Sequence, residues 1–138
     1  MGLDMFAKLV NDRASELISA GQWDELTYED IKDTFIDDDF WYWRKHHHLH
    51  GWMQKLHAYK TGFDAPDLFN LVYVELTEKD LDALEFAIKN GELTPTQGFF
   101  FGSHVEYEDE DKQRDLEFVY ASRKAIADGH HVVYTSWW

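Results

Sequence analysis

Residues 40–60, FWYWRKHHHLHGWMQKLHAYK, form the part of the chain richest in side chains that can bind or react. They include three tryptophans, five histidines and four basic residues, in a chain that is otherwise strongly acidic. Arginine presents a planar fork of donors to phosphate, a tryptophan face stacks on another ring, and histidine exchanges a proton near neutral pH. The segment is therefore predicted to be the working face of the protein, with a small anionic or nucleotide-like ligand as its favoured partner.

The same segment is predicted to form the main helix, from about residue 40 to about residue 57. On such a helix the apolar stripe comprises Tyr42, Leu49, Trp52, Met53 and Leu56. The opposite, wet face comprises Arg44, His48 and Lys55. A third stripe, on the margin of the buried face, comprises Trp43, His46, His47, His50 and His57.

Side chains on that margin line a cleft if a neighbouring strand leaves one open. The neighbour expected is the run GFFFGS at residues 98–103, whose glycines permit close approach and whose phenylalanines offer a stacking surface. The predicted ligand-binding set is Trp43, Arg44, Lys45, His47, His50, Trp52, Phe99 and Phe101. Two alternatives stay open: a margin of rings that only pack, and a GFFFGS strand buried on both faces.

A metal site is the sharpest competing interpretation of the histidines. His46 and His50 are four residues apart and share a helix face, which is the spacing of helical zinc sites. A third ligand is missing, because His57 lies about 10 Å further along the helix axis. The chain has no cysteine, which removes zinc–cysteine sites and a cysteine nucleophile. We expect no metal and no other cofactor.

Catalysis has weaker support than binding. His50 is a candidate general acid or base, but no nucleophile or substrate accompanies it. The sequence contains no Walker loop, no dinucleotide-binding glycine pattern and no hydrolase elbow. No catalytic residue is therefore assigned, and a small histidine-dependent enzyme is kept as an alternative.

Size and charge limit the classes of partner. A length of 138 residues with 44% hydrophobic side chains suits one globular domain, residues 1–138. A formal charge of −14 repels a phosphate backbone and argues against general nucleic-acid binding. It also leaves open an acidic protein-interaction inhibitor that resembles a nucleic acid. No apolar run is long enough to cross a bilayer, so we expect no membrane partner and a cytoplasmic location.

The remaining segments predict an α+β domain. An edge strand is expected at residues 3–9, with a helix beginning at Asp4 as the alternative, and a short helix is expected from Thr27. Strands are expected at residues 69–76, 98–102 and 130–138. One helix follows Thr77 and ends before Gly91. A second covers residues 108–128, with a buried face of Leu116, Val119, Tyr120 and Ile126. The result is a small, mostly antiparallel sheet packed with three to four helices.

Four stretches together resemble a family of small bacteriophage proteins of unknown function. They are the opening MGLDM, YWRK at residues 42–45 followed by His50 and Trp52, the GFFFGS run, and the Ser-Trp pair at residues 136–137. In that family an asparagine follows the YWRK motif at the position of His47, so no role that needs an amide there is implied. Some members carry a phosphoglycerate kinase label, which this chain is too short to support and for which it has no nucleotide loop.

The resemblance implies a phage accessory protein that works in the host cytoplasm. Such a protein binds a host protein or sequesters a small molecule, in order to counter host defence. This expectation agrees with the ligand-binding face predicted from residues 40–60.

Overall fold

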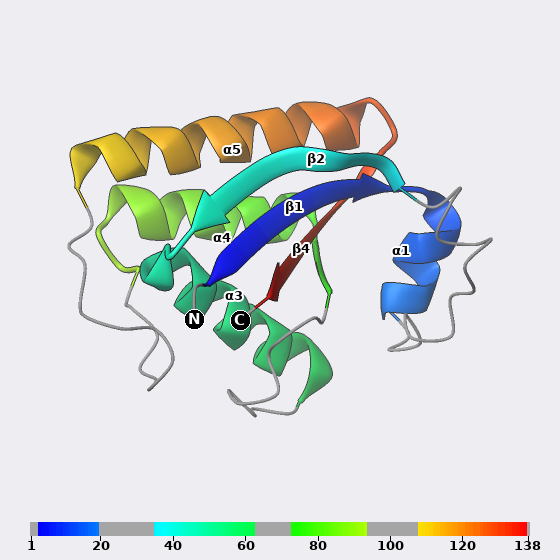
Figure 1. Cartoon of the computed structure of the whole chain (residues 1–138), viewed down its shortest axis with the longest axis horizontal. Helices are drawn as coiled ribbons and strands as arrows, with labels where there is room; N and C mark the ends of the chain where they lie inside the picture. The colour runs from blue at the N-terminus through cyan, green and yellow to red at the C-terminus, as the bar shows by residue number, and fades with distance from the viewer. Residues whose placement is uncertain (1–2, 20–34, 63–72, 94–107, 138) are drawn as a thin grey trace.

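Two strands far apart in the sequence, β1 (Asp4–Val10) and β4 (His131–Trp137), lie side by side in the middle of the sheet (Figure 1). The computed structural model describes residues 3–19, 35–62, 73–93 and 108–137. Within these ranges the other strands are β2 (Phe35–Arg44) and β3 (Val74–Leu76). The helices there are α1 (Asp12–Ser19), α3 (His47–Thr61), α4 (Glu78–Lys89) and α5 (Asp109–Ala127). The predicted α+β class with an antiparallel sheet is confirmed.

The described strands are ordered β2-β1-β4-β3, and all three neighbouring pairs are antiparallel. The strand predicted at residues 3–9 is therefore correct, but its placement at an edge is wrong. The alternation of Leu3, Met5, Ala7 and Leu9 puts these side chains into the core. The strand is central because both of its backbone edges are paired, which no local pattern can reveal.

Residues 40–44 belong to β2, so the predicted start of the main helix at residue 40 is wrong. The aromatic run favours a pleated strand, and Tyr42 and Trp43 pair with Phe6 and Met5 of β1. The strand stops at Lys45, whose φ of 56° lies in the left-handed region. The backbone N–H of Lys45 donates to the carbonyl of Leu3 at 2.8 Å, and α3 then begins at His47.

Helices α4 and α5 begin where charged and hydroxyl side chains cap them. The Thr77 hydroxyl accepts from the backbone N–H of Asp80, and the Asp80 carboxylate accepts from that of Thr77, as a capping box does. Gly91 follows α4 with a φ of 67°. In α5, Val119 is buried and Leu116 and Ile126 are half-buried, as predicted, whereas Tyr120 is 47% exposed.

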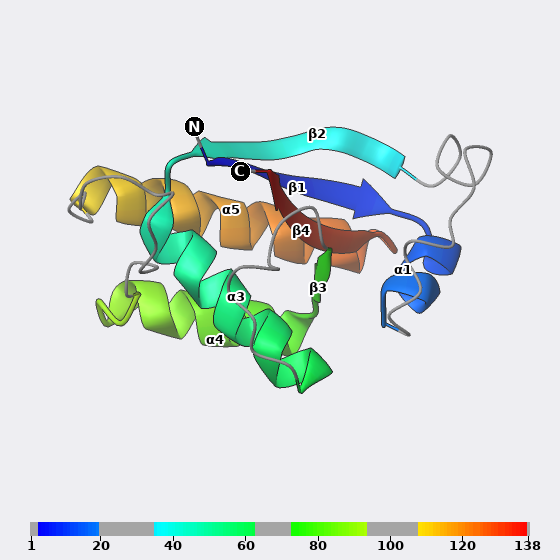
Figure 2. The same cartoon turned by 60° about the horizontal axis from the view of Figure 1, so that its bottom comes forward.

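The sheet separates two unequal layers (Figure 2). Helices α3, α4 and α5 cover one face and share the main core with it. Helix α1 covers only one end of the other face, where Ala14 and Ile18 pack against Val10 and Val133. We call the rest of that second face, around Phe6, Tyr42 and Trp137, the outer face. None of the helices in the described ranges has the length and hydrophobicity that a bilayer crossing requires.

Several predicted elements lie outside the described residues. They are the short helix from Thr27, the first part of the strand at 69–76 and the GFFFGS strand. Of the strand at 69–76, the structure describes Val74–Leu76 as β3, and the strand predicted at 130–138 is confirmed as β4.

Candidate functional site

The residues predicted to line one cleft are divided by the structure into two groups. Trp43 and His50 are 2% and 1% exposed, and His47 is also buried. Trp52 is half-buried and packs against the core. Arg44 and Lys45 are exposed at the end of β2. Phe99 and Phe101 lie outside the described residues.

Trp43 is buried because β2 is a strand and directs this side chain into the core. Its ring meets Phe118 edge to face, with the ring centroids 4.7 Å apart. Its indole Nε1 donates to Oδ1 of Asp115 in α5 at 3.2 Å. The residue therefore joins the sheet to α5 and offers no free stacking surface.

Asp115 also binds His46, the residue that precedes α3. Nε2 of His46 lies 2.6 Å from Oδ2 of Asp115, and Asp115 is 1% exposed. Nδ1 of His46 accepts from the backbone N–H of Leu49 at 3.4 Å, as an N-cap does. Because Nδ1 accepts, Nε2 carries the proton and donates it to Asp115. The ring thus caps α3 and satisfies a buried carboxylate.

His50 lies beside Tyr134 of β4 in the core. Its Nδ1 is 2.7 Å from the Tyr134 hydroxyl. Burial, together with a smaller effect of the nearby His47, lowers the pKa of His50 from 6.5 to about 3. Burial also raises the pKa of Tyr134 well above 10. His50 is therefore neutral at neutral pH, unlike a general acid or base, whose pKa lies near the working pH.

The pair His46 and His50 was the predicted metal candidate. Both rings face hydrogen-bonding partners instead, Asp115 for His46 and Tyr134 for His50. Across the described ranges, no three or more histidine or acidic side chains are grouped so that they could hold a metal ion.

The outer face of the sheet carries an aromatic surface. Tyr42 and Trp137 are 45% and 61% exposed. The rings of Phe6 and Tyr42 are 5.3 Å apart, so they form a contiguous surface. Trp137 is paired with Asp4, and Asp4 is paired with Arg44, so these three side chains form one row across β4, β1 and β2.

Two cationic side chains, those of Lys8 and Arg44, lie on this face, although the chain as a whole is acidic. Nζ of Lys8 lies over the Phe6 ring, 5.6 Å from its centroid. Arg44 is exposed. The one carboxylate in the row, Asp4, accepts from the Tyr42 hydroxyl at 2.6 Å. The hydrogen bond to Asp4 raises the pKa of Tyr42.

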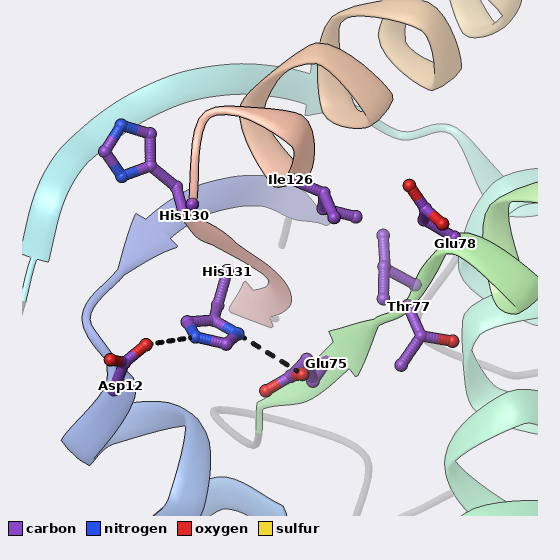
Figure 3. A pocket seen from close by; sticks show the side chains of 9 residues that line it. Asp12, Glu75, Thr77, Glu78, Ile126, His130 and His131 are labelled. Atoms are coloured by element: carbon purple, nitrogen blue, oxygen red, sulfur yellow. Dashed lines mark hydrogen bonds and ion pairs between the residues drawn. The ribbon is translucent and has the colours of Figure 1, made fainter.

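A pocket of about 350 Å³ lies elsewhere, between the start of α1, the end of β3 and the turn from α5 to β4 (Figure 3). Its lining comprises Asp12, Glu75, Leu76, Thr77, Glu78, Ile126, Gly129, His130 and His131. His131 stands between two carboxylates, with Nε2 2.6 Å from Oδ1 of Asp12 and Nδ1 3.7 Å from Oε2 of Glu75.

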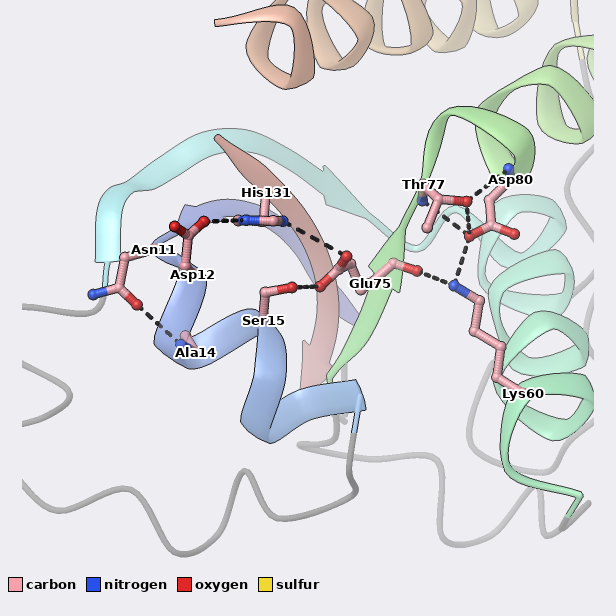
Figure 4. A network of polar contacts seen from close by, with 9 residues as sticks. All are labelled: Asn11, Asp12, Ala14, Ser15, Lys60, Glu75, Thr77, Asp80 and His131. Atoms are coloured by element: carbon pink, nitrogen blue, oxygen red, sulfur yellow. Dashed lines mark hydrogen bonds and ion pairs between the residues drawn. The ribbon is translucent and has the colours of Figure 1, made fainter. Parts of the chain in front are cut away.

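A polar network continues from the pocket along β3 (Figure 4). The Ser15 hydroxyl donates to Oε1 of Glu75, which fixes that carboxylate from the α1 side. Nζ of Lys60 donates to the carbonyl of Glu75 at 2.5 Å and to Oδ2 of Asp80 at 2.6 Å. The pKa of Asp80 is lowered. Burial acts to raise this pKa, but the hydrogen bonds from Lys60 and Thr77 lower it by more.

Sequence reasoning missed two of these features. Asp115 stands at helical spacing from the buried Phe118, Val119 and Ser122, so a carboxylate on the apolar face of α5 was the available signal. The pocket had no local signal, because Asp12, Glu75 and His131 come from three separate elements.

The chain matches no protein-family model, no curated protein and no solved structure. The resemblance to small phage proteins therefore stays a prediction. A function has to be argued from the geometry of the described residues.

Proposed function

We propose that this protein is a non-catalytic binding protein whose outer face holds a small anionic, nucleotide-like ligand. The observation that carries the proposal is the row of Trp137, Asp4 and Arg44 beside the exposed Tyr42 ring. The ligand class is the one predicted from residues 40–60. The site differs, because Arg44 belongs to it whereas Trp43 and His50 are core residues.

The spacing of the row suits a ligand with an aromatic and a charged end. Arg44 and Trp137 are two strand spacings apart, or about 10 Å between backbones. A base that stacks on Trp137 or Tyr42 contributes about 1–3 kcal/mol. The guanidinium of Arg44 then meets a phosphate with charge-assisted hydrogen bonds. Asp4 repels anions, but one of its two carboxylate oxygens already accepts from the Tyr42 hydroxyl.

The expected affinity for a single mononucleotide is modest. The chain carries a charge of −14, so the approach of an anion is opposed at long range. Stacking and one phosphate contact together give a Kd on the order of 1 mM. Added salt screens the repulsion, so binding weakens less with salt than it does for a basic protein.

The test is a calorimetric titration with AMP, with ribose 5-phosphate and adenosine as probes that lack the base or the phosphate. Trp137→Ala and Arg44→Ala should each weaken AMP binding at least about fivefold. Tyr120→Ala and Lys124→Ala are matched controls, since both residues are exposed on α5. Absence of AMP binding, or equal losses in the control variants, contradicts the proposal.

A host protein is the second candidate partner for the same face. Tyrosine, tryptophan and arginine are the residue types that dominate protein-interface hot spots, and the face exposes one of each. The resemblance to phage proteins adds the proposal that the partner, in either case, belongs to the host cytoplasm and that binding counters host defence. General nucleic-acid binding and membrane binding are not part of the proposal.

The acidic-inhibitor alternative has less support. The acidic residues Asp109, Glu110 and Asp111 stand in the first turn of α5, where negative charge stabilises a helix. Glu85 and Asp82 both pair with Arg123. These carboxylates have local structural roles, so their number alone does not indicate an imitation of nucleic acid.

A further inference from the structure

We infer that the open edge of β2 pairs in antiparallel fashion with the β2 edge of a second copy of this chain, which makes a two-fold dimer. Among the described strands, β2 stands at one end of the order β2-β1-β4-β3 and pairs only with β1. The inference does not depend on the ligand proposed for the outer face, because it concerns the backbone edge of the sheet.

The backbone of β2 directs hydrogen-bonding groups to this open edge. In an antiparallel pair, alternate residues direct both backbone groups towards the partner strand, and the residues between them direct theirs away. The N–H of Lys45 donates to the carbonyl of Leu3, opposite it across the pair. Tyr42 and Arg44 therefore direct their backbone groups away from β1. Such groups at a sheet edge are a template for an added strand.

The side chains along β2 leave this edge accessible. Ile36 and Tyr42 are 50% and 45% exposed, and Asp37 and Arg44 are also exposed. The outward carbonyl of Tyr42 accepts from Nη2 of Arg114, an exposed side chain of α5, at 2.8 Å. A carbonyl oxygen has two lone pairs, so a second donor has room beside this arginine.

The charges along β2 select a second copy as the occupant. Residues 37–39 are three aspartates, residues 40–43 are aromatic, and Arg44 and Lys45 follow. An antiparallel self-pair centred on the aromatic stretch sets the acidic end of each strand against the basic end of the other, and opposite charges across strands are stabilising. A parallel self-pair sets like charges together. The pattern is therefore self-complementary about a two-fold axis, as a symmetric dimer requires.

The expected dimer is weak. Each copy carries a charge of −14, so two copies repel each other at long range. The pairing of β1 with β2 shifts register between Ala7 and Leu9, so the regular part of the edge is short. We therefore expect a Kd on the order of 10 μM.

The test is sedimentation equilibrium of the whole chain at 150 mM salt, from about 1 to about 300 μM. We expect a monomer–dimer equilibrium. Asp37→Lys and Arg44→Glu should each weaken the dimer at least about fivefold, because each sets like charges across the axis. The double variant exchanges the charges and should recover most of the loss. A wild type that stays monomeric, or a double variant that dimerises no better than the single variants, overturns the inference.

Matched controls separate pairing from general charge. Lys79→Glu and Glu92→Lys make the same changes in charge at exposed positions in α4 and beyond its end, and Figure 2 shows α4 on the far side of the molecule from β2. Both should leave the dimer unchanged, and each variant's Tm shows whether it remains folded. Trp137→Ala should also leave it unchanged, which separates the dimer from the proposed ligand site. Losses in Lys79→Glu and Glu92→Lys equal to those in β2 contradict the inference.

Hydrogen exchange of the wild type tests the same edge without a substitution. The backbone N–H groups of Tyr42 and Arg44 should exchange more slowly as the chain concentration rises and the dimer forms. The N–H of Trp43, which faces Met5 of β1, should change less. Exchange at Tyr42 and Arg44 that is independent of concentration, in a sample that sedimentation shows to be dimeric, places the interface elsewhere and overturns the inference.

Discussion

Nε2 of His46 lies 2.6 Å from Oδ2 of Asp115, although 69 residues separate the two in the chain. The other oxygen of Asp115 accepts from the indole of Trp43. One buried carboxylate thus joins β2, the start of α3 and the middle of α5. The spacing of His46 from His50 made its ring a candidate metal ligand. In the structure the ring instead helps to connect the sheet to the helices.

We predict that Asp115→Ala lowers the free energy of unfolding by about 2–4 kcal/mol. The change leaves the buried indole N–H of Trp43 and the partly buried imidazole N–H of His46 without an acceptor. Urea unfolding followed by tryptophan fluorescence measures the loss. Glu117→Ala, an exposed neighbour in α5, should change the stability by less than about 0.5 kcal/mol. Equal stability of Asp115→Ala and wild type would show that the two contacts do not hold the core together.

The low pKa of His50 makes stability depend on pH. In the unfolded chain His50 takes up a proton near pH 6.5, whereas the folded protein resists it down to about pH 3. The contribution of neutral His50 to the free energy of unfolding is therefore complete above pH 6.5, and it is lost as the pH falls towards 3. Between pH 7.5 and pH 5.0 the wild type should lose about 2 kcal/mol more than His50→Gln. Parallel losses in the two proteins, measured by urea unfolding at both pH values, contradict the assignment.

Lys45 is predicted to be a site of backbone strain between β2 and α3. At a φ of 56° a glycine is unstrained and a β-branched residue is strongly disfavoured. Lys45→Gly should therefore be more stable than Lys45→Val by about 1–2 kcal/mol, with the wild type between them. Thermal unfolding of the three proteins gives the order, and Val above Gly would rule out a left-handed conformation at this position.

The Ser122 hydroxyl is fully buried and, in the described structure, makes no hydrogen bond. Its desolvation is uncompensated, so Ser122→Ala should leave the stability unchanged or raise it by about 1 kcal/mol. Ser136→Ala is the comparison, because the buried Ser136 hydroxyl is hydrogen-bonded to Tyr134 and should be costly to remove. A larger loss at position 122 than at position 136 would indicate a partner for Ser122.

The elements that sequence reasoning predicted correctly are those with local signals. The cap at Thr77 and the apolar spacing of Leu81, Leu84 and Ile88 identify α4 without reference to the rest of the chain. The strand β4 is likewise indicated by its run of branched and aromatic residues.

The errors occur where pairing with a distant segment decides the outcome. Residues 40–44 suit a helical wheel as well as a strand, and only the partner strand β1 settles which forms. No glycine or proline marks the junction at Lys45. The local sequence therefore predicts a helix that continues back through Trp43 and Arg44, which places the side chains on the wrong faces. The pocket is built from three separate elements and was beyond local reasoning altogether.

The pairing of β1 with β4 has a consequence for synthesis on the ribosome. The centre of the sheet pairs residues 4–10 with residues 131–137. The ribosome must therefore make nearly all of residues 4–137 before the two strands can meet. Until then β1 can pair only with β2. The apolar side chains of Leu3, Met5, Ala7 and Leu9 lack most of the residues that bury them in the folded protein. Helices α4 and α5, with local caps and local contacts, are able to form earlier, whereas the sheet has to wait for a loop of high contact order to close. The nascent chain is therefore most exposed to misassembly while residues 108–137 are still being made.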